Sequence, residues 1–362
     1  MPPDFQRLMQ DATRLTRQGD LQAATAAIQA ALRQTAAEPP YANAALVIDV
    51  EAREVHSPAE ARPALPGTSP NAPAADAQPV REAFVAGRFG PPGAAGRDYK
   101  LYIPPQAQAQ PRPLVVMLHG CTQHADDFAA GTAMNEAARA QGCYVLYPVQ
   151  SDKANPQRCW NWFKHSHQGR GRGEPAILAG MTRQVMAEHG IDPARVYVAG
   201  LSAGGAMAAI LGEAYPELYA AVGVHSGLAA GTARDLPSAL QAMKSGAARS
   251  RHAAHGVPTI VFHGDADQTV HPANGGQVFA ASAGAASKAD VVRQQQPGRR
   301  QVTRHLVRGA EGEVMAEHWV VHGAGHAWSG GTRRGSYTDP QGPDASGEML
   351  RFFLEHPRRP RH

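Results

Sequence analysis

The stretch Val196-Tyr-Val-Ala-Gly-Leu-Ser-Ala-Gly-Gly-Ala-Met207 decides how the rest of this 362-residue chain is interpreted. It begins as a short apolar run with β-branched and aromatic residues, which is typical of a buried strand. It then passes through Gly200-Leu-Ser-Ala-Gly204 and continues with small and apolar residues, which favour a helix. The predicted order is therefore a strand, a G-x-S-x-G turn and a helix.

The serine in the middle of this turn, Ser202, is the predicted nucleophile. A serine on a sharp turn takes a strained backbone, and glycines two residues before and after it let the strand and the helix pass close together. The helix start points N–H groups to the place where an oxyanion would form, so Ala203 N–H is the first expected donor. A glycine-rich turn without chemistry is the alternative. The flanking strand and helix favour the nucleophile elbow of an α/β-hydrolase.

Composition narrows the class of protein. The chain is 43% hydrophobic and 18% charged, which is typical of a globular protein, and its formal charge of +4 is a mild excess. No Lys/Arg block is interleaved with aromatic residues, so we expect no nucleic-acid partner. No run of about 18 apolar residues occurs, so we expect no transmembrane segment. No signal peptide is visible, which predicts a cytoplasmic location.

The sequence predicts three parts. Residues 1–35 carry apolar side chains at helical spacing on both sides of a Gly-Asp break, which predicts an N-terminal helical hairpin. Residues 36–80 are rich in Ala and Pro and predict a linker. Residues 81–358 form the predicted catalytic domain. Apolar runs alternate there with helical segments, so the expected fold class is α/β, an α/β-hydrolase fold whose mostly parallel sheet is flanked by helices.

Individual elements follow from the same patterns. Strands are expected at residues 99–103, 114–118, 143–147, 196–199, 220–224, 258–262 and 317–321, and helices at 128–140, 176–188 and 346–355. The strand at 99–103 is expected at an edge of the sheet, because two prolines follow it. The insertion at 228–256 follows the strand after the elbow and is expected to be a mobile surface segment.

The acid and the base follow from chain order. A serine hydroxyl needs a base, the base needs an orienting carboxylate, and in this fold the acid and then the histidine follow the serine. The loop after the 258–262 strand holds two carboxylates, and we favour Asp267, which lies further into the loop, over Asp265. The last clear strand leads into a glycine-containing loop, where His326 is the favoured base and His322 the alternative.

A second oxyanion donor is expected from the turn after the 114–118 strand, His119-Gly-Cys-Thr122. In that turn Cys121 N–H is the favoured donor. His119 is expected to be a turn residue rather than a second base. Of the remaining histidines, His225 and His318 are expected to have surface, turn or strand roles.

Several motifs occur together in order along the chain: Leu118-His-Gly-Cys121, Arg158-Cys-Trp-Asn-Trp162, Gly200-Leu-Ser-Ala-Gly204, His263-Gly-Asp-Ala-Asp267 and Gly325-His-Ala-Trp-Ser-Gly330. In them the chain resembles the poly(3-hydroxybutyrate) depolymerase family of esterases, a group that also contains feruloyl and acetylxylan esterases. The resemblance covers roughly residues 84–356. It implies an α/β-hydrolase fold, no metal or other cofactor, and ester hydrolysis through an acyl-serine. By the family pattern Ser202, Asp267 and His326 fall on the triad.

The resemblance also implies a disulfide between Cys121 and Cys159, with two free thiols as the alternative. Its extracellular members make an extracellular location the alternative to a cytoplasmic one. Trp328 lies two residues from the expected base, and Trp160 and Trp162 lie in the loop of Cys159. All three tryptophans are expected to line an aromatic-walled cleft. For Trp160 the alternative is a core anchor.

The expected substrate is a polyhydroxyalkanoate or hydroxybutyrate ester. Feruloyl or acetylxylan esters of plant polysaccharide are the alternative with the same chemistry. From another class, the alternative is a granule-associated binding protein with a silent hydrolase domain. The hairpin at 1–35 would then attach the chain to a hydrophobic granule surface.

Overall fold

The structure is a computed structural model that describes residues 82–90, 96–105, 110–246, 256–283, 289–295 and 297–358. The expected hairpin at 1–35 and the expected linker at 36–80 lie outside the described residues. Within the described ranges, none of the helices combines the length and the apolar character that a membrane span requires.

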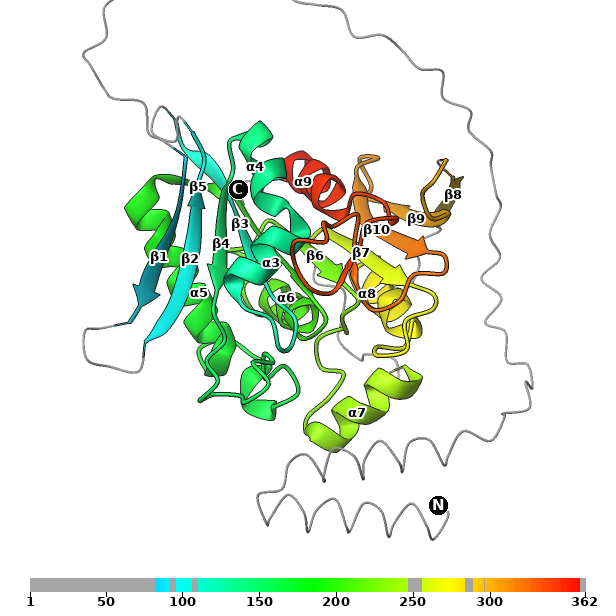
Figure 1. The fold of residues 1–362 in the computed structure, drawn as a ribbon, viewed down its shortest axis with the longest axis horizontal. Coiled ribbons are helices and arrows are strands. Elements are labelled where there is room, and N and C mark those ends of the chain that lie inside the picture. Colours follow the sequence, from blue (N-terminus) through cyan, green and yellow to red (C-terminus); the bar gives the residue numbers. More distant parts are fainter. Residues whose placement is uncertain are drawn as a thin grey trace, which may run out of the picture. The chain divides into compact units, whose positions relative to one another are not determined.

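A ten-stranded sheet forms the centre of the described part of the chain, with the strand order β1-β2-β4-β3-β5-β6-β7-β10-β9-β8 (Figure 1). Its strands are β1 (Ala83–Phe89), β2 (Arg97–Ile103), β3 (Arg112–Leu118), β4 (Tyr144–Pro148), β5 (Ile191–Leu201), β6 (Ala221–His225), β7 (Thr259–Gly264), β8 (Asp290–Gln294), β9 (Val302–Arg308) and β10 (Val314–Val321). The strands from β4 to β10 in this order run parallel to one another. The strands outside them, β1 and β2 at one edge and β9 and β8 at the other, pair antiparallel. The mostly parallel sheet is confirmed.

The central strands carry runs of buried apolar residues, such as Leu114–Leu118 in β3, because both faces of the sheet are covered. In β3, Leu114 and Val116 belong to one core cluster, whereas Val115 and Met117 belong to another, and all four are fully buried. This alternation is the two-residue period of a strand with a core on each side.

Helices supply the two outer layers. They are α3 (Ala125–Thr132), α4 (Met134–Gln141), α5 (Gly173–His189), α6 (Ala203–Ala214), α7 (Leu236–Ser245), α8 (Ala273–Ala283) and α9 (Ala345–Glu355). Side chains of α5, α6 and α8 belong to the first core cluster, and side chains of α3, α4 and α9 to the second. The sheet therefore lies between two helical layers, as the α/β-hydrolase prediction requires.

The structure corrects several boundaries. The strand expected at the edge, β2, is paired along its length with β1, which is the true edge strand. The helix expected over 128–140 is two helices, since Ala133 takes a left-handed conformation (φ 52°) between α3 and α4. The 228–256 insertion contains helix α7. Asp235 caps this helix by accepting a hydrogen bond from Ser238 N–H. Strands β1, β8 and β9 and helices α7 and α8 were not expected.

One buried histidine gives the fold a measurable acid sensitivity. His318 lies in β10 with 8% of its surface exposed, and its Nε2 atom has no hydrogen-bond partner among the described residues. Its ring packs on Phe279 and His305. Burial, together with the charges of His263 and His305, lowers the pKa of His318 to about 3.

We predict that His318→Phe makes the fold less sensitive to acid. Below pH ~6.5 the unfolded chain binds a proton at this histidine and the folded chain does not, so stability falls with pH down to the folded pKa. The free energy of unfolding of the variant, measured with urea between pH 5.5 and 4, should fall less steeply than that of wild type, by about 1.4 kcal/mol per pH unit. Equal slopes would show that His318 titrates normally in the folded state.

Candidate active site

The G-x-S-x-G turn joins β5 directly to α6. Ser202 has φ 57° and ψ −118°, a strained conformation for a residue with a side chain. Its backbone N–H donates to the carbonyl oxygen of His225 at 2.9 Å, and its own carbonyl accepts from Ala206 N–H at 2.9 Å. The hydroxyl group is thus presented at the carboxyl ends of the parallel strands, beside the first turn of α6.

The two glycines of the turn are required by close backbone approaches. A Cβ atom on Gly200 would lie 2.4 Å from the carbonyl carbon of Gly204. A Cβ atom on Gly204 would lie 2.0 Å from the carbonyl oxygen of Leu118, in the neighbouring strand β3. These distances are far below any van der Waals contact, so a side chain at either position would force the turn apart.

The favoured acid and base lie against each other. His326 Nδ1 lies 2.7 Å from Asp267 Oδ2, and the Asp267 side chain is fully buried. Asp267 Oδ1 accepts the backbone N–H groups of Thr269 and Val270, each at 2.9 Å. Burial alone would raise the pKa of Asp267, but hydrogen bonds from His263 and His326 and the charge of His326 hold it well below the usual range. A carboxylate is therefore present to fix one imidazole tautomer.

The alternative acid, Asp265, and the alternative base, His322, form a second pair. His322 Nδ1 lies 2.7 Å from Asp265 Oδ2, and Thr303 Oγ1 lies 2.8 Å from its Nε2. Asp265 also accepts the N–H of Gly323 at 2.6 Å. This second pair is about 40% exposed at the carboxylate, and both nitrogens of its ring are engaged. The structure thus sorts the four candidates into one buried pair and one exposed pair.

Ser202 and the Asp267–His326 pair lie at the same edge of the sheet. Ser202 follows β5, Asp267 follows β7, and β6 lies between these strands. The described residues contain no hydrogen bond between the Ser202 hydroxyl and the His326 ring. Such bonds are often long in ligand-free sites and tighten when substrate binds. The three candidates thus belong to loops at one edge of the sheet, and a contact between Ser202 and His326 is not formed within the described residues.

His225, for which a surface, turn or strand role was expected, is the last residue of strand β6 and is buried (1% exposed). Its carbonyl oxygen holds the Ser202 N–H, and its Nε2 accepts the N–H of Ser329 at 2.9 Å. The ring stacks on Trp328 with a centroid distance of 5.0 Å. Burial, with the charges of His263 and His326, lowers the pKa of His225 to about 3, so the ring stays neutral. Its position at the end of β6 was the only sequence signal.

The expected oxyanion donors are free. In the turn after β3, Gly120 N–H donates to Gln123 Oε1 at 3.0 Å and Thr122 N–H donates to the carbonyl of Gln157 at 2.7 Å. Cys121 N–H and Ala203 N–H have no hydrogen-bond partner within the described ranges. Both expected donors thus retain an unused proton at the edge where Ser202 lies.

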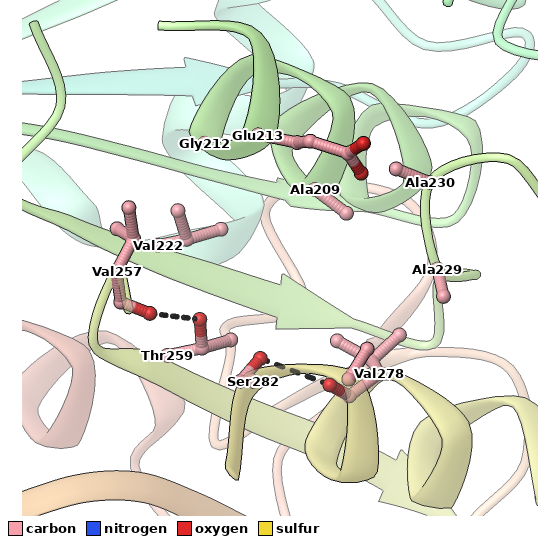
Figure 2. Close-up of a pocket in the computed structure, with 11 residues that line it drawn as sticks. Ala209, Gly212, Glu213, Val222, Ala229, Ala230, Val257, Thr259, Val278 and Ser282 are labelled. Carbon is pink, nitrogen blue, oxygen red and sulfur yellow. Dashed lines mark hydrogen bonds between the residues drawn. The ribbon is translucent and has the colours of Figure 1, made fainter. Parts of the chain in front are cut away.

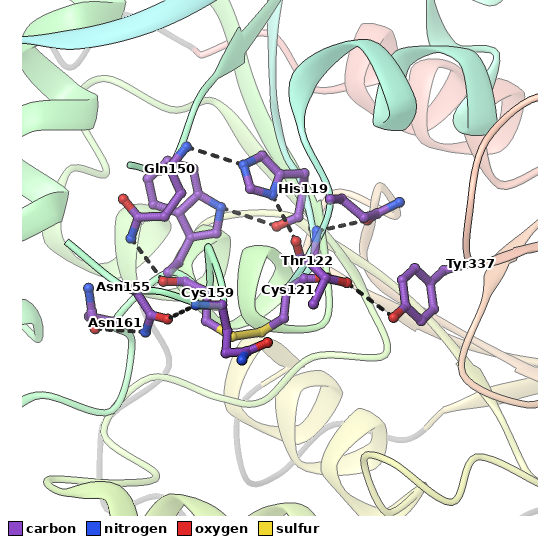
Figure 3. Close-up of a disulfide and its surroundings, with 12 residues drawn as sticks. His119, Cys121, Thr122, Gln150, Asn155, Cys159, Asn161 and Tyr337 are labelled. Carbon is purple, nitrogen blue, oxygen red and sulfur yellow. Dashed lines mark hydrogen bonds between the residues drawn. A yellow bond between two sulfur atoms is a disulfide. The ribbon is translucent and has the colours of Figure 1, made fainter. Parts of the chain in front are cut away.

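The turn His119-Gly-Cys-Thr122, called the oxyanion turn below, is held in place by several contacts (Figure 3). A disulfide joins Cys121 to Cys159, and Trp160 Nε1–H donates to the carbonyl of His119 at 3.1 Å. His119 Nε2 accepts the N–H of Gln150 at 3.2 Å, and its Nδ1 lies 2.8 Å from the Gly120 carbonyl. Burial lowers the pKa of His119 to about 4. His119 is therefore a neutral, fully engaged turn residue.

The tryptophans expected to line the cleft lie in the interior. Trp160 and Trp328 are each 1% exposed and Trp162 is 5% exposed. Trp328 Nε1–H donates to Ser346 Oγ at 3.1 Å, and its ring packs edge-on against Phe128. A buried ring offers no surface to a ligand, so the structure corrects this expectation: these side chains anchor the loops that carry the site.

A small crevice lies away from these residues, between α6 and α8 (Figure 2). Its lining consists mostly of small and apolar residues, among them Ala209, Val222 and Val278, together with the carboxylate of Glu213. Val222 and Thr259 stand near the amino ends of β6 and β7, whereas Ser202 and Asp267 follow the carboxyl ends of their strands. The crevice is therefore separate from the candidate active site.

Comparison with known proteins shows which protein family the chain belongs to. Residues 97–292, just over half of the chain, match the family described as Esterase PHB depolymerase. This span contains Ser202 and Asp267 and ends before His326.

Two curated relatives and one solved structure illustrate the match. Poly(3-hydroxyalkanoate) depolymerase C of Paucimonas lemoignei is 35% identical over 175 residues, which are 45% of this chain and 42% of that protein. Feruloyl esterase B of Thermothelomyces thermophilus is 32% identical over 140 residues, 38% of this chain and 47% of that protein. The chain thus spans less than half the length of each relative. An acetyl xylan esterase from Aspergillus awamori shares the fold, with a TM-score of 0.58 and 18% identity over 75% of this chain and 99% of that one.

We predict that Gly204→Ala destabilises the protein by more than about 2 kcal/mol, because the added methyl group would overlap the Leu118 carbonyl. The matched control is Gly276→Ala in α8, where an added Cβ has no neighbour within 4 Å. That control should be neutral or stabilising by up to about 1 kcal/mol, since alanine favours helices. Urea unfolding of both variants checks this, and equal stability of the two would contradict the close approach in the turn.

Proposed function

The chain belongs to the family of PHB depolymerase esterases, and on this premise we propose that it is a serine hydrolase that cleaves carboxylic esters through an acyl-serine intermediate. The observation that carries the proposal is the buried Asp267–His326 pair beside a serine in a strained elbow, with two free N–H groups at the same edge.

The chemistry would proceed in two halves. His326 takes the Ser202 proton as the hydroxyl oxygen attacks the ester carbonyl, and Asp267 stabilises the imidazolium that forms. The N–H groups of Cys121 and Ala203 stabilise the negative charge on the tetrahedral carbonyl oxygen. His326 then gives its proton to the leaving alcohol. Water repeats the sequence on the acyl-serine, which releases the acid and restores Ser202.

For the substrate we propose a polyhydroxyalkanoate or hydroxybutyrate ester. The support is the similarity to a protein named a poly(3-hydroxyalkanoate) depolymerase, the more similar of the two relatives described above. Feruloyl and acetylxylan esters are the second candidate, because relatives with those names match 38% and 48% of this chain. A granule-binding protein without turnover has less support, since the candidate nucleophile, acid and base follow strands that end at the same edge of the sheet.

Location and attachment are proposals of the same kind. We propose a compartment that permits disulfides, because Cys121–Cys159 holds the turn that carries an oxyanion donor. Attachment to a hydrophobic granule through residues 1–35 is a separate proposal that rests on the amphipathic sequence pattern alone.

The direct test is turnover of the purified protein on p-nitrophenyl butyrate, hydroxybutyrate oligomers, emulsified poly(3-hydroxybutyrate) and methyl ferulate. We expect hydrolysis of the first three, and Ser202→Ala should lower kcat by at least about 10⁴-fold, because the nucleophile is removed. Ser282→Ala in α8 is the matched control and should keep wild-type rates. Ferulate release without hydroxybutyrate release would favour the plant-wall substrates, and turnover by Ser202→Ala at the wild-type rate would refute the mechanism.

A further inference from the structure

The buried tryptophans leave the candidate active site without its expected aromatic wall. Among the described residues, the exposed large hydrophobic side chains are those of Val85, Leu236, Leu240 and Tyr337, and Tyr337 is the aromatic one. The residue is 47% exposed. Within the described ranges its ring makes no aromatic or cation–π contact. An unpartnered aromatic ring beside a catalytic turn is a ready surface for the apolar part of a substrate.

Tyr337 lies directly beside the oxyanion turn, although it is more than 200 residues away along the chain. Its hydroxyl oxygen lies 3.1 Å from Thr122 Oγ1. Figure 3 marks this contact with a dashed line. Thr122 Oγ1–H donates to the Cys121 carbonyl at 2.6 Å, so the threonine has no proton left for the tyrosine. The Tyr337 hydroxyl must therefore be the donor in their hydrogen bond. This chain of contacts ends on the residue whose N–H is an expected oxyanion donor.

The backbone of Tyr337 also contacts the loop after β10 that carries His326, called the base loop below. Its carbonyl oxygen accepts the N–H of Trp328 at 2.7 Å, two residues after His326. The short strands β11 (Trp328–Ser329) and β12 (Thr338–Asp339) continue this contact as a parallel pair. Tyr337 thus stands between the oxyanion turn on one side and the base loop on the other.

The loop that carries Tyr337 is fixed in place. Ser336 N–H donates to Asp127 Oδ1 at 2.9 Å, and Thr332 N–H donates to the Gly131 carbonyl at 2.8 Å. At Gly335 a Cβ atom would lie 2.3 Å from the Asp127 carbonyl oxygen, so the loop approaches α3 as closely as backbone allows. Tyr337 itself has φ 52°, which costs energy for an aromatic residue. Strain of this kind persists where the surroundings hold a side chain in one position, often at a functional site.

We propose that the Tyr337 ring forms the aromatic wall of the substrate site and contacts the apolar part of a bulky ester next to the oxyanion turn. The inference rests on the proposed serine-hydrolase function and names a residue that sets its substrate preference. It assigns the ring to substrate selection and the hydroxyl to bracing the oxyanion turn. These two roles can be separated by mutation.

The test compares a small ester, ethyl acetate, with a bulky one, p-nitrophenyl hexanoate, in wild type, Tyr337→Ala and Tyr337→Phe. Loss of the ring should raise KM for the bulky ester and lower its kcat/KM about tenfold relative to ethyl acetate. Tyr337→Phe keeps the ring, so the ratio of kcat/KM between the two esters should stay at the wild-type value, with any change confined to kcat. Val85→Ala on β1, another exposed apolar residue, is the control and should match wild type.

The outcomes separate this inference from the function on which it rests. An equal loss on both esters in Tyr337→Ala, carried by kcat, would show that the residue only braces the turn and would overturn the inference. An unchanged ratio in an active variant would overturn it as well. A wild-type protein that hydrolyses neither ester would refute the proposed function itself, and the role of Tyr337 with it.

Discussion

The Asp267 carboxylate is buried, and the groups that stabilise its charge come from three segments. Two backbone N–H groups from its own loop reach Oδ1, His326 lies 2.7 Å from Oδ2, and His263 Nε2 from β7 lies 3.4 Å from the same oxygen. A buried carboxylate is costly unless such partners are present. The loops after β7 and β10 must therefore lie together for the fold to be stable. The contact that stabilises the charge also positions the imidazole.

The same loops are held to the elbow through His225. Its main chain accepts the Ser202 N–H and its ring accepts the Ser329 N–H, so one residue contacts both the nucleophile turn and the base loop. The ring can accept that second bond only while it is neutral, and its burial ensures this. A residue with no chemical role of its own therefore links the nucleophile turn, through its main chain, to the loop that carries His326, through its side chain.

The sequence was sufficient to predict the parallel sheet, because its middle strands contain short apolar runs, such as Leu114-Val-Val-Met-Leu118, that alternate with helical segments. It was also sufficient to place Ser202, since the close approaches of Gly200 and Gly204 leave a pattern that few other turns need. Strands β8 and β9 were missed because they form an edge hairpin rich in polar residues, and edge strands have only a weak hydrophobic period.

Within the site, the sequence could name the acids and histidines but could not pair them by geometry. Asp265 and Asp267 are two residues apart, and only the fold shows that one is buried and the other exposed. Burial also reversed the expectation for the tryptophans: sequence proximity to His326 suggested a cleft wall, whereas Trp328 points into the core. Tyr337 was missed because its contact with Thr122 joins segments that are distant in sequence.

The central claim is that the buried Asp267–His326 pair, rather than the exposed Asp265–His322 pair, activates Ser202. The most direct measurement is kcat on p-nitrophenyl butyrate for Asp267→Asn and Asp265→Asn, side by side with wild type. An amide at 267 no longer holds the imidazole in the required tautomer, so kcat should fall by about 10³- to 10⁴-fold. Asp265→Asn should stay within about threefold of wild type, because its pair is exposed and separate. A greater loss in Asp265→Asn than in Asp267→Asn would contradict the account.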